Sequence, residues 1–222
     1  MPKDRILFAK EGRARYISHL DLMRTFQRAF VRADIPIKHT EGFNPHPFIS
    51  IALPLSLGFS STCEILEFGL LEGTTHEEVP GRLNAALPEG VRVLECYAGE
   101  RPMRELQWID YKIEIDFAGD VEGLCEAWSE LLSRESWIVE KPSKKAKSGV
   151  VTVDIPTLIK EFAFTDETED GCILVVSLAA QNPGLNPSVM VNALTEACPR
   201  FIPEFIHYRR LEVLDKDGKI FR

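Results

Sequence analysis

The apolar positions between Ser18 and Asp34 repeat with the spacing of an α-helix that has one buried face. The residues in this pattern are Leu22, Phe26, Ala29, Phe30 and Ala33. Ser18, with Asp21 three residues later, is typical of a capping box that starts a helix, and the proline after Ile35 predicts its end. Arg24, Arg28 and Arg32 follow one another at intervals of four residues, so we expect them to share an outward face.

Alternating apolar and polar residues on either side of this helix predict five strands and one more helix in the first half of the chain. The predicted strands cover residues 5–11, 37–40, 48–53, 63–71 and 91–98, and the second helix covers residues 75–87. Apart from one inserted segment, the order over residues 1–98 is β-α-β-β-α-β. This order is that of the ferredoxin-like unit.

The second half of the chain repeats the order without obvious sequence identity. The predicted strands begin at residues 111, 137, 150, 172 and 207, and the predicted helices cover residues 121–133 and 187–197, the latter capped by Asn186. We therefore predict an α+β protein of two tandem ferredoxin-like (βαββαβ) domains, residues 1–100 and 108–222. The first domain carries the inserted loop Gly-Phe-Asn-Pro-His-Pro at residues 42–47.

The composition is that of a folded, soluble protein, with 222 residues, 45% hydrophobic and 27% charged. No secretion signal or membrane-spanning run is visible, so we expect a cytoplasmic protein with no membrane partner. The five cysteines are scattered, which favours free thiols over a disulfide framework. No paired-cysteine motif for zinc or an iron–sulfur cluster occurs, so no cofactor is expected in this chain.

Positive charge is concentrated near the N-terminus of an otherwise acidic chain. The formal net charge is −8, yet residues 1–50 hold nine Lys/Arg against five acids, a net of +4 that leaves −12 for the remainder. Such asymmetry favours a local anion-binding face, although surface charge also divides unevenly by chance. The residues predicted to contact nucleic acid are Arg13, Arg15, His19, Arg24, Arg28, Arg32, Asn44, His46, Lys144, Lys145 and Lys147.

Three groups within this set have alternative interpretations. The lysines lie in a short charge run, which is either a phosphate contact or a solvated loop. His19 follows the helix cap, where it contacts an anion or packs at the helix start. The prolines flanking His46 stiffen a loop that suits either recognition or a structural crossing, and His39 with His46 leaves open a metal pair that lacks a third ligand.

The sequence contains none of the common catalytic motifs: no nucleophile elbow, phosphate-binding P-loop, zinc-protease motif or dinucleotide fingerprint. If the protein is an enzyme, His19 or His46 is the candidate acid or base.

Several N-terminal motifs together resemble the radical-SAM-linked protein family of bacteria. They are Arg-Tyr-Ile-Ser-His-Leu-Asp-Leu-Met-Arg at 15–24, the helix end at 28–33, the loop at 42–47, and Leu-Pro-Leu-Ser-Leu-Gly-Phe-Ser-Ser at 53–61 before Glu64. Members of that family occur beside, or fused behind, a radical S-adenosylmethionine enzyme. The resemblance implies such an enzyme as partner, holding the iron–sulfur cluster for which this chain has no ligands. A remoter, architectural likeness is to the CRISPR repeat-processing endoribonucleases, whose glycine-rich C-terminal loop is missing here.

Three functional hypotheses follow. The leading one is a non-catalytic accessory protein that binds RNA, or an RNA-modifying radical-SAM partner, through the basic N-terminal surface. The second is a metal-independent endoribonuclease or other hydrolase that uses His19 or His46. The third is a protein-interaction module that docks a partner through residues 43–48.

Overall fold

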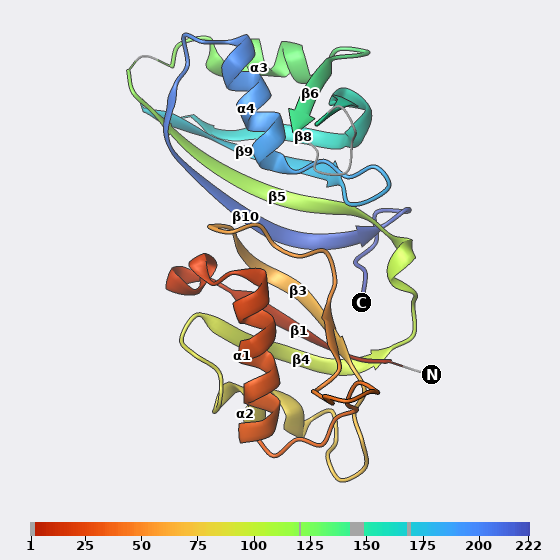
Figure 1. Ribbon diagram of the computed structural model, residues 1–222. Helices are drawn as coiled ribbons and strands as arrows, with labels where there is room; N and C mark the ends of the chain where they lie inside the picture. The colour runs from red at the N-terminus through yellow and green to blue at the C-terminus, as the bar shows by residue number, and fades with distance from the viewer. Residues whose placement is uncertain (1–2, 120, 143–148, 168–169) are drawn as a thin grey trace. The chain divides into compact units, whose positions relative to one another are not determined.

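The computed structural model describes residues 3–119, 121–142, 149–167 and 170–222. In these ranges the chain is a mixed α+β protein with four α-helices and antiparallel strand pairing. It divides into two compact units, one formed by Met1–Glu105 with Phe221–Arg222 and the other by Leu106–Ile220. Figure 1 shows the elements of each unit.

The first unit is an antiparallel sheet with two helices. Its elements, in chain order, are β1 (Lys3–Lys10), α1 (His19–Arg32), β2 (Ile49–Ile51), β3 (Ser60–Phe68), α2 (Glu78–Asn84) and β4 (Val91–Gly99). Strand β1 pairs with both β3 and β4, and β2 pairs with β3, so the strand order is β4-β1-β3-β2. A short 3-10 helix, Gly12–Tyr16, connects β1 to α1.

Helix α1 starts where its sequence predicts. Ser18 is the N-cap, and its Oγ accepts a hydrogen bond from the backbone N–H of Asp21 at 3.2 Å. The return bond of a capping box is not the one expected, because the carboxylate of Asp21 accepts from the Ser18 hydroxyl at 2.7 Å instead of from its backbone. The helix therefore begins at His19, and the two hydrogen bonds between Ser18 and Asp21 hold its first turn.

One hydrophobic core joins the helices of this unit to its sheet. The ring of Phe26 on α1 meets Phe8 on β1 edge-on at a centroid distance of 4.8 Å, and Phe30 meets Phe68 on β3 at 5.0 Å. All four rings are at most 1% exposed. The first pair is edge-to-face and the second is tilted, at 43° between the ring planes. Aromatic pairs in favourable geometry add about 0.5–1.5 kcal/mol to the burial of their area, so these contacts hold α1 on the sheet.

Two segments of this unit differ from the sequence prediction. Residues 37–40 form only isolated bridges, Ile37 to Leu70 and His39 to Pro47, because the flanking prolines have no N–H with which to continue a ladder. Helix α2 is shorter than residues 75–87, since Thr75–Glu78 is a turn and the Asn84 side chain exchanges hydrogen bonds with the backbone of Val93 on β4.

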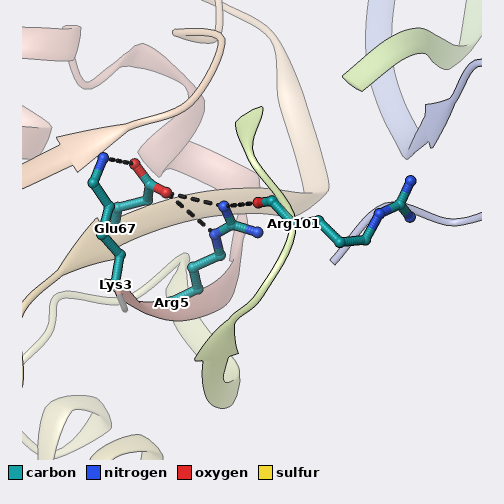
Figure 2. Close-up of polar contacts among 4 residues, drawn as sticks. All are labelled: Lys3, Arg5, Glu67 and Arg101. Atoms are coloured by element: carbon teal, nitrogen blue, oxygen red, sulfur yellow. Dashed lines mark hydrogen bonds and ion pairs between the residues drawn. The ribbon is translucent and has the colours of Figure 1, made fainter. Parts of the chain in front are cut away.

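A buried ion pair crosses from β1 to β3, as Figure 2 shows. The guanidinium of Arg5 donates to Oε1 of Glu67 at 3.0 and 3.3 Å and to the backbone carbonyl of Arg101 at 2.5 Å. Lys3 donates to the other carboxylate oxygen at 2.7 Å. Because the side chain of Arg5 is 2% exposed and that of Glu67 is 8% exposed, this pair ties β1 to β3 and to the segment after β4 in a place shielded from water.

The second unit contains the strands β5 (Leu106–Phe117), β6 (Ile138–Pro142), β7 (Val150–Asp154), β8 (Ile159–Glu167), β9 (Gly171–Ala179) and β10 (Pro203–Asp215), with helices α3 (Leu124–Leu132) and α4 (Pro187–Ala197). Four strands form an antiparallel sheet in the order β10-β5-β9-β8, and β6 pairs with β7. The Asn186 side chain caps α4 as its sequence predicts. Trp128 of α3 is fully buried and packs edge-on against Phe117 at 5.8 Å.

No disulfide joins cysteines in the part of the chain that the structure describes, and three of them are buried: Cys63, Cys125 and Cys172. Across the described ranges, no helix has the length and apolar character needed to cross a membrane.

Candidate anion-binding site

Three arginines form an exposed face on α1, which we call the arginine face: Arg24, Arg28 and Arg32. All three are exposed, while Phe26 and Phe30 of the same helix are buried against the sheet. The four-residue interval places the arginines on the opposite side from the apolar stripe, as the sequence predicts.

A depression of about 790 Å³ lies between α1 and α2, at the C-terminal ends of both helices. Its lining includes Arg28, Arg32 and Arg82, and none of the lining residues is acidic. Arg82 lies in the last turn of α2, fifty residues beyond Arg32 along the chain, and sequence reasoning missed it. Only the packing of α2 beside α1 brings its charge to the arginine face.

The arginines of this depression differ in how much of their hydrogen-bonding capacity is occupied. Arg82 donates to the carbonyls of Ala33 and Asp34 and to Thr74, and so caps the C-terminus of α1, where a positive charge is favourable. Arg32 donates one bond to the Ala86 carbonyl at 2.5 Å.

The protein occupies fewer of the N–H donors of Arg24 and Arg28. Arg24 forms an ion pair with Asp21 at 3.3 Å, and both side chains are at least 60% exposed, so the pair is weak. Arg28 makes no hydrogen bond or short ion pair within the described residues, and its charge interacts with the carboxylate of Asp21 only through space. Its five N–H donors therefore remain for a ligand.

A second, smaller depression of about 400 Å³ connects the arginine face to the loop at 42–47. It is lined by the three arginines together with Gln27, Val31 and Pro47. The amide of Gln27 donates to the carbonyl of Pro47 at 3.3 Å. The structure thus places the root of the loop against the middle of α1.

The loop itself is a closed turn that projects from this root. The backbone N–H of Thr40 donates to the His46 carbonyl at 2.9 Å, and the His46 N–H donates to the Thr40 hydroxyl at 3.2 Å. Gly42 has φ of +126°, a conformation that a side chain would strain. Nδ1 of His46 lies 3.1 Å from that hydroxyl and 3.2 Å from the Asn44 carbonyl, so this ring atom is engaged within the loop.

The N-terminal end of α1 is a poorer place for an anion than the sequence suggests. The side chain of Asp21 occupies the first turn, where hydrogen bonding from Ser18 and the neighbouring Arg24 lower the pKa of its carboxyl. A carboxylate there already uses the positive end of the helix dipole and repels a second anion near His19.

Arg13 and Arg15 lie in the 3-10 helix before α1, away from the arginine face along the chain. Arg15 donates to the Tyr16 hydroxyl at 2.7 Å and stacks over its ring at 4.8 Å. Lys144, Lys145 and Lys147 lie outside the described residues.

The two histidines proposed as acid or base are at different levels of α1. His19 is its first residue, whereas the loop of His46 meets the helix at Gln27, about 12 Å further along the axis at 1.5 Å per residue. The described residues contain no group of three or more His, Cys, Asp or Glu side chains placed to hold a metal ion.

A separate histidine interaction links Asp4 of β1 to His76 before α2 at 2.8 Å, in a region that also contains Cys96. Burial, followed by the charge of Asp4, raises the pKa of the Cys96 thiol to about 12. The thiolate needed for nucleophilic attack is therefore disfavoured at this cysteine.

The fold and the site define a mixed α+β protein with an exposed arginine face on α1, next to a depression at the C-terminal ends of α1 and α2. The chain belongs to a bacterial family, described as "Uncharacterized protein conserved in bacteria (DUF2344)", whose family model matches residues 3–187. No curated protein matches the sequence.

Among solved structures, the chain is similar to one described as "Crystal Structure of a Cbf5-Nop10-Gar1 Complex". The TM-score is 0.54 and the sequence identity is 10%, with 95% of this chain covered. The chain spans 48% of the length of that structure's matched chain. At this identity the likeness concerns the fold alone.

Proposed function

We propose that the protein is an accessory protein that binds RNA through the arginine face of α1. The observation that supports this most directly is the pair of adjoining depressions, which share Arg28 and Arg32 on a chain whose formal net charge is −8. A protein that is acidic overall retains a concentrated positive surface only at some cost in local repulsion. Such a surface attracts polyanions even when the rest of the molecule repels them.

The arginines suit phosphate groups better than lysines would. A guanidinium presents planar, paired N–H donors that match two phosphate oxygens. Arg28 has all its donors unoccupied by the described residues, and Arg32 has one in use. Each phosphate neutralised releases a counterion, so the affinity must fall as salt rises, with a slope of about 0.7 per contact for a single strand.

Filter binding of labelled cellular RNA across a salt series tests this function. The variant replaces Arg24, Arg28 and Arg32 with alanine. The control replaces Arg92, Lys216 and Lys219, which are exposed residues elsewhere in the chain, and removes the same three charges. We expect the affinity of the first variant to fall at least tenfold, and the slope of its log affinity against log salt concentration to become smaller by about two. The control should keep the affinity and the slope of the unmodified protein. Absence of RNA binding at low salt, or equal losses in the two variants, contradicts the proposal.

The partner proposed for this protein is a radical S-adenosylmethionine enzyme, and the proposed location is the cytoplasm. The support for the partner is the resemblance of the motifs at 15–24, 42–47 and 53–61 to the radical-SAM-linked family. Purification of the tagged protein from its bacterial host, with nuclease treatment of the lysate, tests it. We expect such an enzyme to remain bound after the RNA is removed, and its absence would refute the partnership.

We also propose that the two units are tandem ferredoxin-like domains. The support is the order of strands and helices: β4-β1-β3-β2 with α1 and α2 in the first unit, and β10-β5-β9-β8 with α3 and α4 in the second. In each unit a helix follows the first strand and another precedes the last, as in the split βαβ arrangement.

A further inference from the structure

We propose that the RNA is bound as a single strand, with successive phosphates along the arginine face and an unpaired base stacked on Phe43. This inference rests on the proposed function and adds the form of the ligand and a residue that recognises it.

The ring of Phe43 is fully exposed at the tip of the loop, with a relative accessibility of 112%. A phenylalanine with no packing contact contributes nothing to the fold, and it exposes apolar surface that water solvates poorly. The tip is nevertheless held in place, because the bonds between Thr40 and His46 close the loop below it. A ring on such a support loses little conformational entropy when a ligand stacks on it.

The loop is anchored to the same surface as the arginines. Pro47, at its root, lines the smaller depression together with Arg24 and Arg28, and its carbonyl accepts the hydrogen bond from Gln27. Phe43 therefore projects from a segment that is fixed beside the arginine face. A ligand bound on the arginine face therefore lies next to the root of the loop from which Phe43 projects.

The spacing of the arginines agrees with a strand that runs along the helix. Residues four apart are separated by about 6 Å along the axis at 1.5 Å per residue. This separation is similar to that between neighbouring phosphates in an extended polynucleotide strand. Arg24, Arg28 and Arg32 can therefore each meet a successive phosphate of one strand.

A single strand also fits the exposed aromatic ring, whereas a duplex does not. In a helical duplex the bases are stacked on one another and their faces are covered. In a single strand they are free to stack on aromatic side chains, and this combination of a cationic track with an aromatic platform is typical of single-strand binding.

Fluorescence anisotropy with two RNAs of identical sequence tests the inference: a labelled single-stranded 12-mer and the same 12-mer annealed to its complement. We expect the single strand to bind the unmodified protein at least tenfold more tightly. Phe43→Ala should weaken single-strand binding by about 5- to 150-fold, the range expected for the loss of one stacked base. Phe43→Tyr, which retains the ring, should bind as the unmodified protein does. Leu57→Ala removes another exposed apolar side chain of the same unit and should have no effect.

The outcomes separate this inference from the proposed function. Equal or tighter binding of the duplex, or an unchanged affinity in Phe43→Ala, overturns the single-strand inference. If the triple arginine variant still loses affinity in that case, the RNA-binding function stands. If Phe43→Ala keeps its RNA affinity but no longer retains a protein partner, Phe43 belongs to a protein contact instead. No binding of either RNA at low salt overturns both proposals.

Discussion

The buried ion pair in Figure 2 gives the most quantitative prediction about stability. Replacing Glu67 with glutamine removes the negative charge that Arg5 faces at 3.0 Å, while preserving the shape of the side chain. At an effective dielectric constant of about 20, two unit charges at that distance attract by about 5 kcal/mol. Measured costs of leaving one member of a buried pair without its partner are about 3–5 kcal/mol. We therefore expect Glu67→Gln to lower the free energy of unfolding of the first unit by about 3–5 kcal/mol.

Lys3 provides the internal comparison, because it contacts the same carboxylate from the surface. Its side chain is 52% exposed although the bond to Glu67 is only 2.7 Å long. Exposed pairs contribute about 0–1 kcal/mol, so Lys3→Ala should have little effect. Changing both members of the buried pair, Arg5→Met with Glu67→Leu, should recover most of the loss, because no buried charge is then left alone.

The assay must report on the first unit. The three tryptophans, Trp108, Trp128 and Trp137, all lie in the second unit, so their fluorescence follows that unit. Native-state hydrogen exchange of peptides from β1 and β3 is suitable, since their amides exchange through the opening of the sheet. Glu89→Gln, which replaces an exposed carboxylate of the same unit with a carboxamide, is the matched control. The reasoning is refuted if Glu67→Gln loses no more protection than Lys3→Ala.

Two further predictions concern single positions in the first unit. Gly90 has φ of +84°, and a Cβ added there would lie 2.5 Å from the Glu11 carbonyl oxygen and 2.9 Å from the Ala14 Cβ. Gly81 in α2 has open space where its Cβ would be. Gly90→Ala should destabilise the unit by more than about 1 kcal/mol, and Gly81→Ala should stabilise it by up to about 1 kcal/mol. Hydrogen exchange measures both changes, and equal effects of the two substitutions would contradict the steric argument. Burial raises the pKa of Cys96 to about 12, so the folded state keeps this proton after the unfolded state has begun to lose it near 9. Stability should therefore fall as the pH rises above 9, and less steeply in Cys96→Ala; identical slopes in urea unfolding at pH 8 to 10.5 would exclude Cys96 as the source.

Local sequence signals predicted the elements whose causes are local. Ser18 caps α1 because its hydroxyl accepts from a backbone N–H three residues away, and the side-chain oxygen of Asn186 caps α4 by accepting from the N–H of Ser188, two residues away. The period of apolar residues in α1 predicted which side meets the sheet and therefore that Arg28 is exposed. The predicted strand at 37–40 was wrong because strand propensity does not count the missing N–H groups of the surrounding prolines.

The sequence predicted only part of the candidate site, because residue spacing describes a single segment of the chain. The arginines of α1 follow from a helical period, but Arg82 reaches their surface only because α2 packs beside α1, and its interaction with the carbonyls of Ala33 and Asp34 depends on that packing. The sequence likewise suggested His19 as an anion contact, and the side chain of Asp21 folding back on Ser18 weakens that interpretation. Spacing along one chain segment thus determined which residues share a face. Contacts between distant segments decided which faces meet. They also decided which charges are occupied by the protein's own carbonyls and carboxylates, and no local period of the sequence encodes such contacts.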